Sequence, residues 1–276
     1  MLVVDAQVHI WGADTPERPW PKRAAPQRPV PLGKDELLRE MDEAGVDRAI
    51  IVPPSWEGDR NDLAIEAATA HPERFAIMGR LDPQDPRSRG QLRTWRRQPG
   101  MLGLRFTFHT PVLKPLLTEG HMDWVWKEAE EAGVPIYVLV HHDTVEVIDE
   151  VAARHPALKI TMDHLALSSS TKDAVAFAQL DKVLAIARRP NVAAKASALP
   201  SYSTDRYPYA SLHGYIRQAY DAFGPQRLFW GTDISRSPIP YRQHVNLFME
   251  ELPWLSESDK EWIMGRGVCE WLGWPA

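Results

Sequence analysis

The sequence predicts an α/β fold of the (β/α)8 type, a TIM barrel, and three observations lead to it. Seven times along the chain, a helical stretch ends at a glycine or proline and runs directly into a short β-rich segment. With an opening strand at the N-terminus, these segments make eight strands that alternate with helices. The length of 276 residues is close to the roughly 250 typical of such a barrel.

Each predicted strand is a short, continuous apolar run, as expected of parallel strands that are buried on both faces. The eight ranges are Leu2–His9, Val46–Val52, Arg74–Gly79, Met101–Phe106, Val134–Val140, Leu158–Met162, Val192–Lys195 and Arg227–Trp230. An open doubly wound sheet is the alternative, but no glycine-rich phosphate-binding loop follows any of these runs. Because no linker or low-complexity tract divides the chain, we expect one barrel domain over residues 1–276.

The segments between the strands have helical patterns. Lys34–Ala44 and Asp143–Arg154 each carry apolar residues at helical spacing. Ser256 and Asp259 resemble a capping box, which predicts a helical extension at the C-terminus. The proline-rich stretch 12–33 lacks periodicity and follows the first strand, so we expect a lid or pocket wall over the catalytic face.

Composition narrows the class of partner. The formal net charge of -5 offers no basic footprint, so nucleic acid is not expected. No run of about 18 apolar residues predicts a membrane span, and Asp5 comes too early for a signal peptide. The single cysteine, Cys269, excludes an internal disulfide framework and is expected to be a buried packing residue. We therefore expect a cytoplasmic protein that acts on a small molecule, and its tryptophan-rich C-terminus would suit a homo-oligomer interface.

Polar and ionisable residues end most of the predicted strands. The C-terminal ends of barrel strands face a common mouth, and charged residues are costly in strands buried on both faces, so their joint position indicates a site. These residues are Gln7, His9, Arg80, Asp82, Arg105, His141, His142, Asp163, His164, Lys195, Ser197 and Asp233.

Spacing along a strand says which of these side chains share a face. Gln7 and His9 are two residues apart and point to the same side. Asp163 and His164 are adjacent and cannot do so. We therefore expect only His164 to reach the pocket, with Asp163 as a hydrogen-bonded structural partner.

Four segments resemble signature strands of the amidohydrolase superfamily, in its amidohydrolase-2 branch. They occur in the same order as in that branch and are Asp5–Trp11, Leu139–His141, Asp163–Ala166 and Trp230–Asp233. The resemblance implies a distorted TIM barrel. The branch contains lactonases, including those of sugar acids and pyrone dicarboxylate, and metal-dependent nonoxidative decarboxylases and hydratases.

The first strand departs from the family pattern. It normally ends in His-x-His, where both histidines bind a divalent metal, but Gln7 stands in place of the first. The resemblance leaves His9, His141 and Asp233 as ligands if a metal is bound, and zinc or manganese is the alternative cofactor. An amide oxygen is a poorer zinc ligand than imidazole. Some lactonases of the branch work without metal, so Gln7 favours a lactonase that requires no cofactor.

The leading hypothesis is a hydrolase that opens a lactone or similar cyclic ester, carrying a carboxylate or several hydroxyls. Asp233 is the expected general base that activates water. His164 and His141 are expected to polarise the carbonyl and stabilise its oxyanion. The expected substrate-binding residues are Gln7, His9, Arg105 and Lys195, of which Arg105 and Lys195 would hold a carboxylate.

Three other hypotheses remain open at this stage. A metal-dependent nonoxidative decarboxylase or hydratase of an aromatic or enol acid would use a bound metal as Lewis acid and template. Lys195 could instead form a Schiff base, as in barrel aldolases. In the non-enzymatic hypothesis, the barrel binds a small ligand or partner without turnover. Trp11, Trp56 and Tyr202 could stack on a substrate ring, but ordinary packing is the simpler expectation for each.

Overall fold

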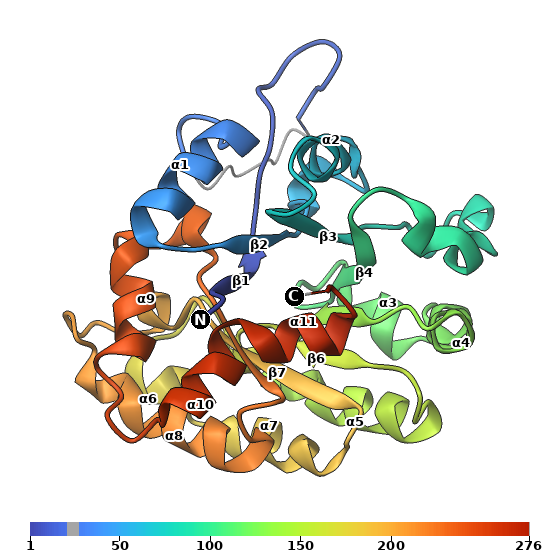
Figure 1. Ribbon diagram of the computed structural model, residues 1–276. Helices are drawn as coiled ribbons and strands as arrows, with labels where there is room; N and C mark the ends of the chain where they lie inside the picture. Colours follow the sequence, from blue (N-terminus) through green and yellow to red (C-terminus); the bar gives the residue numbers. More distant parts are fainter. Residues whose placement is uncertain (21–27, 276) are drawn as a thin grey trace.

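The computed structural model describes residues 1–20 and 28–275, and its eight strands form one parallel sheet in chain order. The strands are β1 (Val4–Val8), β2 (Arg48–Ile51), β3 (Phe75–Gly79), β4 (Met101–Thr107), β5 (Ile136–Leu139), β6 (Ile160–Met162), β7 (Val192–Ser197) and β8 (Leu228–Gly231). Helices surround them on the outside (Figure 1). The predicted (β/α)8 barrel is confirmed, and each strand end lies within two residues of its predicted place.

In the described residues, eleven α-helices cover the sheet. They are α1 (Lys34–Ala44), α2 (Asp62–Ala70), α3 (Lys114–Thr118), α4 (Asp123–Ala132), α5 (Val145–Arg154), α6 (Asp173–Ala176), α7 (Leu180–Ala185), α8 (Ala210–Phe223), α9 (Tyr241–Met249), α10 (Glu257–Glu261) and α11 (Gly267–Leu272). Helix α1 buries Leu37 and Met41 and ends at Gly45, whose φ of 72° is the left-handed conformation that glycine adopts without strain. Helix α5 starts later than predicted because 142–144 form a 3-10 turn.

A side chain holds the last strand against the first. Strand pairing runs from β1 to β8, and Asp233 N donates across the remaining seam to Gln7 O (3.0 Å). The buried Asp5 carboxylate accepts at Oδ1 from the backbone N–H groups of Gln7 and Thr232, both at 2.9 Å. Its Oδ2 accepts from the Thr232 hydroxyl and from Tyr241 (2.7 Å). Burial raises the pKa of Asp5 to about 6 against the opposing effect of these four donors.

The C-terminal extension closes the end of the barrel at which the strands begin, opposite their C-terminal ends. Helices α10 and α11, joined by a π-helical turn at Trp262–Arg266, lie across that end beside both chain termini (Figure 1). A Cβ on Gly265 would lie 2.4 Å from Leu2 O, so only glycine allows this close approach. The predicted capping box of Ser256 and Asp259 is present. Cys269 is buried in this layer, as its sequence context predicted.

Contacts among three tryptophans hold the segment that follows β1. The rings of Trp11 and Trp20 pack edge-on against Trp56, with centroids 6.0 and 5.1 Å away, and Trp11 N donates to Leu32 O (3.1 Å). Packing is therefore the role of Trp11 and Trp56. Part of the predicted lid, residues 21–27, lies outside the described residues.

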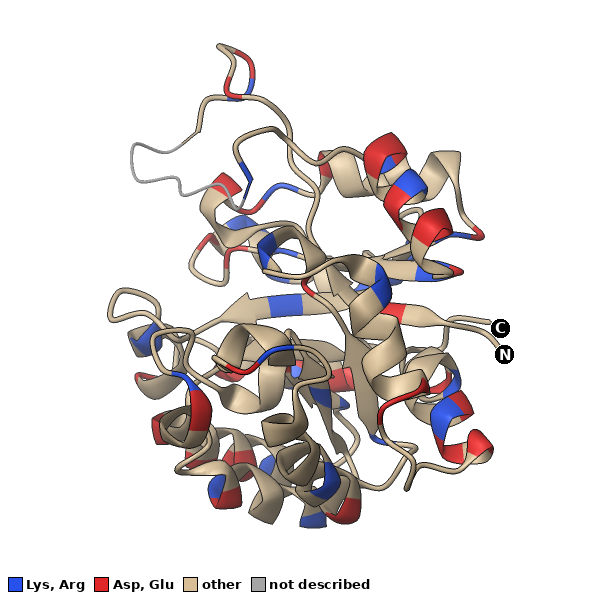
Figure 2. Ribbon diagram, turned by 90° about the vertical axis from the view of Figure 1, so that its left-hand side faces the viewer, with Lys and Arg blue, Asp and Glu red and all other residues tan. Residues whose placement is uncertain are grey.

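The outer surface mixes charges of both signs. Figure 2 shows basic and acidic residues interspersed along the outer helices, and both termini at one end of the barrel. Within the described ranges, no helix is long and apolar enough to cross a membrane.

We predict that His244 on α9 makes the protein less stable in acid. His244 is buried beside Ser237, and burial lowers its pKa to about 4. Between pH 6.5 and 4, His244 is protonated in the unfolded chain but not in the folded protein. The free energy of unfolding therefore falls as pH falls through this range. In His244→Gln, the slope of unfolding free energy against pH, measured by urea unfolding near pH 5, should decrease by about 1.4 kcal/mol per pH unit. The same slope in His244→Gln and in an exposed control, His121→Gln, would contradict this.

Candidate active site

A cavity of about 170 Å³ lies at the C-terminal ends of the strands. It is smaller than the roughly 300–1,000 Å³ of most ligand sites, which limits it to a small ligand. Its lining comprises Gln7, His9, Arg105, His109, Leu139, His141, His164, Leu167, Ser169, Ala198, Ser201, Tyr202, Asp233 and Arg236. The structure thus brings together every predicted catalytic and substrate-binding residue except Lys195.

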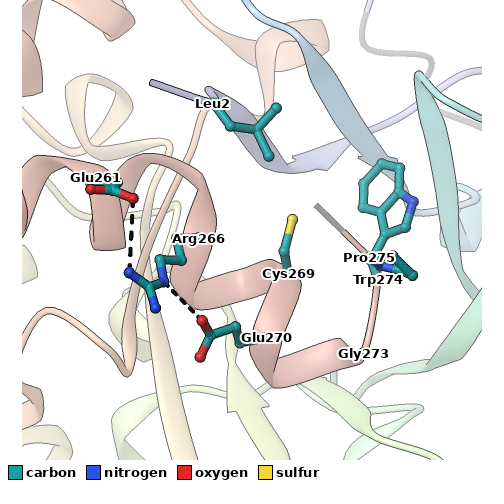
Figure 3. A pocket seen from close by; sticks show the side chains of 8 residues that line it. All are labelled: Leu2, Glu261, Arg266, Cys269, Glu270, Gly273, Trp274 and Pro275. Carbon is teal, nitrogen blue, oxygen red and sulfur yellow. Dashed lines mark hydrogen bonds and ion pairs between the residues drawn. The ribbon is translucent and has the colours of Figure 1, made fainter.

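A larger cavity of about 460 Å³ lies at the opposite end, beside α11 (Figure 3). Leu2 and Trp274 form part of its wall. The one cation of its lining, Arg266, pairs with Glu270 (2.8 Å) and Glu261 (3.9 Å). Because this lining offers neither a histidine nor an unpaired charge, the smaller cavity is the candidate active site.

Asp233 is held in place by a histidine. It follows β8 in the left-handed conformation (φ 49°), a strained backbone state for a residue other than glycine. His9 donates through Nδ1 to Val52 O (2.5 Å), which directs its Nε2 at Asp233 Oδ1 (3.2 Å). Burial alone would raise the pKa of Asp233, but His9, with smaller contributions from His164 and Arg236, holds it well below its usual range. Asp233 is therefore ionised throughout the physiological range.

His164 lies on the other side of Asp233 and is engaged at both ring nitrogens. Its Nδ1 lies 2.7 Å from Ser197 Oγ, and its Nε2 lies 3.2 Å from Gln7 Nε2. Asp233 Oδ2 is 3.8 Å from the same Nε2, too far for a direct hydrogen bond. Burial lowers the pKa of His164 to about 4, so the ring is neutral at pH 7.

A buried ionic layer forms the floor beneath the cavity. Asp163 binds Lys195 Nζ (2.7 Å) and Arg105 Nε (3.1 Å). Although burial opposes it, these two cations hold the pKa of Asp163 below its usual range. Burial lowers the pKa of Lys195 to about 8, and its ammonium lies 3.8 Å from the ring centre of Tyr137. His164, and not Asp163, lines the cavity, in agreement with the sequence analysis.

The expected contact between Lys195 and a substrate carboxylate needs correction. Lys195 is fully buried below the cavity, where its charge is matched by Asp163 and its Nζ donates to Gln7 Oε1. A substrate in the cavity therefore meets Gln7 before it meets Lys195. Arg105 does line the cavity, although its Nε is committed to Asp163.

Two ionisable residues of the lining escaped the sequence analysis. His109 lies two residues beyond β4, with its ring 5.2 Å from that of His141, and burial together with His141 lowers its pKa to about 4. Its spacing of four from Arg105 on an extended segment was a usable signal. Arg236, exposed on the turn after β8, had no such signal. It makes no ion pair with a carboxylate among the described residues.

Other polar strand ends lie outside the cavity. Arg80 is buried beside Asp59 (3.4 Å), and neither Arg80, Asp82 nor His142 contributes to the lining. Of the three aromatic residues considered, Tyr202 alone lines it. No side chain from the described parts of the 12–33 stretch does so.

No metal-binding cluster is assembled among the described side chains. In residues 1–20 and 28–275, no group of three or more His, Cys, Asp or Glu side chains is close enough to hold one. His9 and Asp233 pair with each other, and Gln7 turns its amide oxygen to Lys195. The alternative ligand set of His9, His141 and Asp233 is therefore not assembled as a metal site.

Comparisons with known proteins identify the family. The profile of the amidohydrolase family matches residues 4–266. A curated relative, the L-fucono-1,5-lactonase of Burkholderia ambifaria, is 25% identical over 247 residues, which cover 83% of this chain and 79% of that protein.

Solved structures share the fold at low identity. An amidohydrolase from Burkholderia multivorans, crystallised with bound zinc, superposes with a TM-score of 0.82 at 21% identity, covering 100% of both chains. A Pseudomonas putida protein assigned as a 2-pyrone-4,6-dicarboxylic acid hydrolase gives 0.80 at 18% identity, covering 100% of this chain and 98% of that one.

We predict that Asp163 is the most sensitive member of the buried ionic layer. Asp163→Asn leaves Lys195 and Arg105 as two buried cations without a counter-ion, which should cost about 3–5 kcal/mol of unfolding free energy. Adding Lys195→Met should recover part of that loss, because one uncompensated charge is removed. Urea unfolding measures both effects.

The matched control is Asp221→Asn, which removes an exposed ion pair with Arg217. This change should cost no more than about 1 kcal/mol. Equal losses in Asp163→Asn and Asp221→Asn would show that the buried layer carries no special stability.

Proposed function

The chain belongs to the amidohydrolase family, and we propose that it hydrolyses a lactone or a similar cyclic ester. The observation that carries the proposal is the ionised Asp233, fixed by His9 at the wall of a small cavity that neutral histidines also line. The similarity to an L-fucono-1,5-lactonase supports the same reaction class.

Asp233 is the proposed general base. Its Oδ1 faces His9, which leaves Oδ2 for a water in the space next to His164. This water attacks the carbonyl carbon and gives its proton to Asp233. The ring C–O bond then breaks, and the departing oxygen takes up the proton, so the product is the open hydroxy acid.

The developing oxyanion needs donors on the wall opposite the water. His141 lines the cavity and is proposed to donate to this oxygen. His164 was expected to share the task, but its two nitrogens already contact Gln7 and Ser197. We therefore do not assign it this role.

The charges of the lining favour a substrate with an anionic or strongly polar substituent. Arg105 and Lys195 both form ion pairs with the single carboxylate of Asp163, while Asp233 pairs with His9. Arg236 adds a further positive charge at the mouth. We propose that Arg236, with Arg105 deeper in the cavity, holds a carboxylate or several hydroxyls of a single-ring lactone.

Nonoxidative decarboxylation or hydration is the alternative, and in this branch it depends on a metal. A structural neighbour of this chain was crystallised with zinc, which is a reason to consider a metal-dependent reaction. At 21% identity, however, the similarity to that neighbour shows only a shared fold. His9, His141 and Asp233 do not assemble as ligands in this chain. We therefore propose a reaction without a metal cofactor.

We predict that Asp233→Asn lowers kcat for lactone opening by about 10²- to 10⁴-fold, because the water loses its base. Proton release from a panel of sugar-acid and carboxylated lactones measures the rate, and Asp221→Asn serves as an exposed control.

Purified protein should contain far less than one zinc or manganese per chain, and a chelator should leave the rate unchanged. Loss of activity with the chelator, restored by metal, would move the assignment to the metal-dependent alternative.

We further predict that Arg236→Met discriminates between substrates. A lost charge-assisted hydrogen bond is worth about 1.5–3 kcal/mol, so kcat/KM for a carboxylated lactone should fall roughly 10- to 100-fold. Neutral lactones should be affected far less. Arg242→Met, an exposed substitution on α9, is the control. An equal decrease for charged and neutral lactones would rule out recognition of a carboxylate by Arg236.

A further inference from the structure

Four side chains from three strand ends form a continuous hydrogen-bonded chain under the cavity. Lys195 Nζ contacts Gln7 Oε1, Gln7 Nε2 contacts His164 Nε2 (3.2 Å), and His164 Nδ1 contacts Ser197 Oγ (2.7 Å). All four are at most 4% exposed, so bulk water does not compete for these bonds.

The chemistry of the first member fixes the direction of every other bond. A lysine ammonium donates hydrogen bonds and accepts none, so the Gln7 atom beside Lys195 must be the amide oxygen. The amide nitrogen is then the atom that faces His164. Because an amide nitrogen only donates, His164 Nε2 must accept, and the single proton of a neutral ring resides on Nδ1, where it is donated to Ser197.

We propose that Lys195, acting through Gln7, locks His164 in the tautomer protonated at Nδ1. Lys195 and Gln7 are positioning residues in this arrangement. The ionic floor supports it, since Asp163 (2.7 Å from Lys195 Nζ) and the face of Tyr137 (3.8 Å) hold the ammonium directly beneath Gln7.

The lock has a consequence for catalysis that rests on the proposed lactonase function. His164 Nε2 carries no proton and accepts from Gln7, so it cannot donate to an oxyanion in the cavity. Gln7 lines the cavity and has a second amide hydrogen that His164 does not use. This hydrogen, with His141, takes over the donor role that sequence reasoning gave to His164.

The tautomer can be read without any substrate. Two-bond ¹H–¹⁵N correlation spectra of histidine-labelled protein at pH 7 distinguish protonated from unprotonated ring nitrogens. The His164 signals are assigned by their loss in His164→Asn. We expect a protonated Nδ1 and an unprotonated Nε2 in the wild type. A protonated Nε2 in the wild type would overturn the proposal.

Two substitutions test the direction of control. Gln7→Glu replaces the donor facing His164 by an acceptor, so Nε2 should become protonated. Gln218→Glu on the outside of α8 introduces the same charge at an exposed position and should leave the His164 signals unchanged. Ser197→Ala removes the acceptor of the Nδ1 proton but keeps Gln7, so the wild-type tautomer should persist. A switch to Nε2–H in Ser197→Ala would place the control in Ser197 and refute the role of Lys195 and Gln7.

Kinetics separate this proposal from the assignment of the reaction. If no lactone is turned over but the tautomer pattern holds, the lock stands and the reaction class fails. If lactones are hydrolysed, Gln7→Met should lower kcat by about 10²- to 10³-fold, the usual effect of removing one oxyanion donor, with a smaller change in KM. An unchanged kcat in this variant would overturn the donor role of Gln7.

Discussion

The Asp5 carboxylate is the constraint on which the site depends, because it holds the closing strand of the barrel to the first. It binds two backbone N–H groups and two hydroxyls, so one side chain connects β1, the end of β8 and α9. Gly231 leaves room for it, since a Cβ there would lie 3.3 Å from Asp5 Oδ1. This closure places His9 and Asp233, which are far apart in the sequence, within 3.2 Å of each other.

The barrel interior is divided by polarity along its axis. Apolar side chains such as Phe229 and Cys269 fill the end covered by α11, whereas ionisable groups occupy the end that opens to the cavity. The Arg105–Asp163–Lys195 layer lies between the two regions. Buried charges of this kind require partners, and both cations pair with the one carboxylate. The layer therefore carries a net positive charge. The floor can therefore orient Gln7 and favour negative charge in the cavity.

The replacement of a family histidine by Gln7 changes what the first strand contributes. Imidazole could ligate a metal, whereas the amide offers one oxygen and one nitrogen with fixed hydrogen-bonding character. Lys195 takes the oxygen, so the nitrogen is directed at His164. The position is thus occupied by an amide whose oxygen faces the buried Lys195 ammonium and whose nitrogen faces His164.

The sequence by itself determined the barrel and the location of its site, because helix stops and apolar runs are local signals. It also predicted that Asp233, His164 and His9 face a common cavity, as they do, because polar residues at the C-terminal ends of buried strands are a local signal, although Arg80, Asp82 and His142 carried the same signal and lie outside the cavity. Strand ends were less well defined, as in Val134–Val140 against the observed Ile136–Leu139, because pairing with neighbours decides where a ladder stops. Tertiary structure alone decided that Lys195 lies below the cavity and that Arg236 reaches it. Such contacts join residues from different strands, and strand tilt, register and closure set their distances.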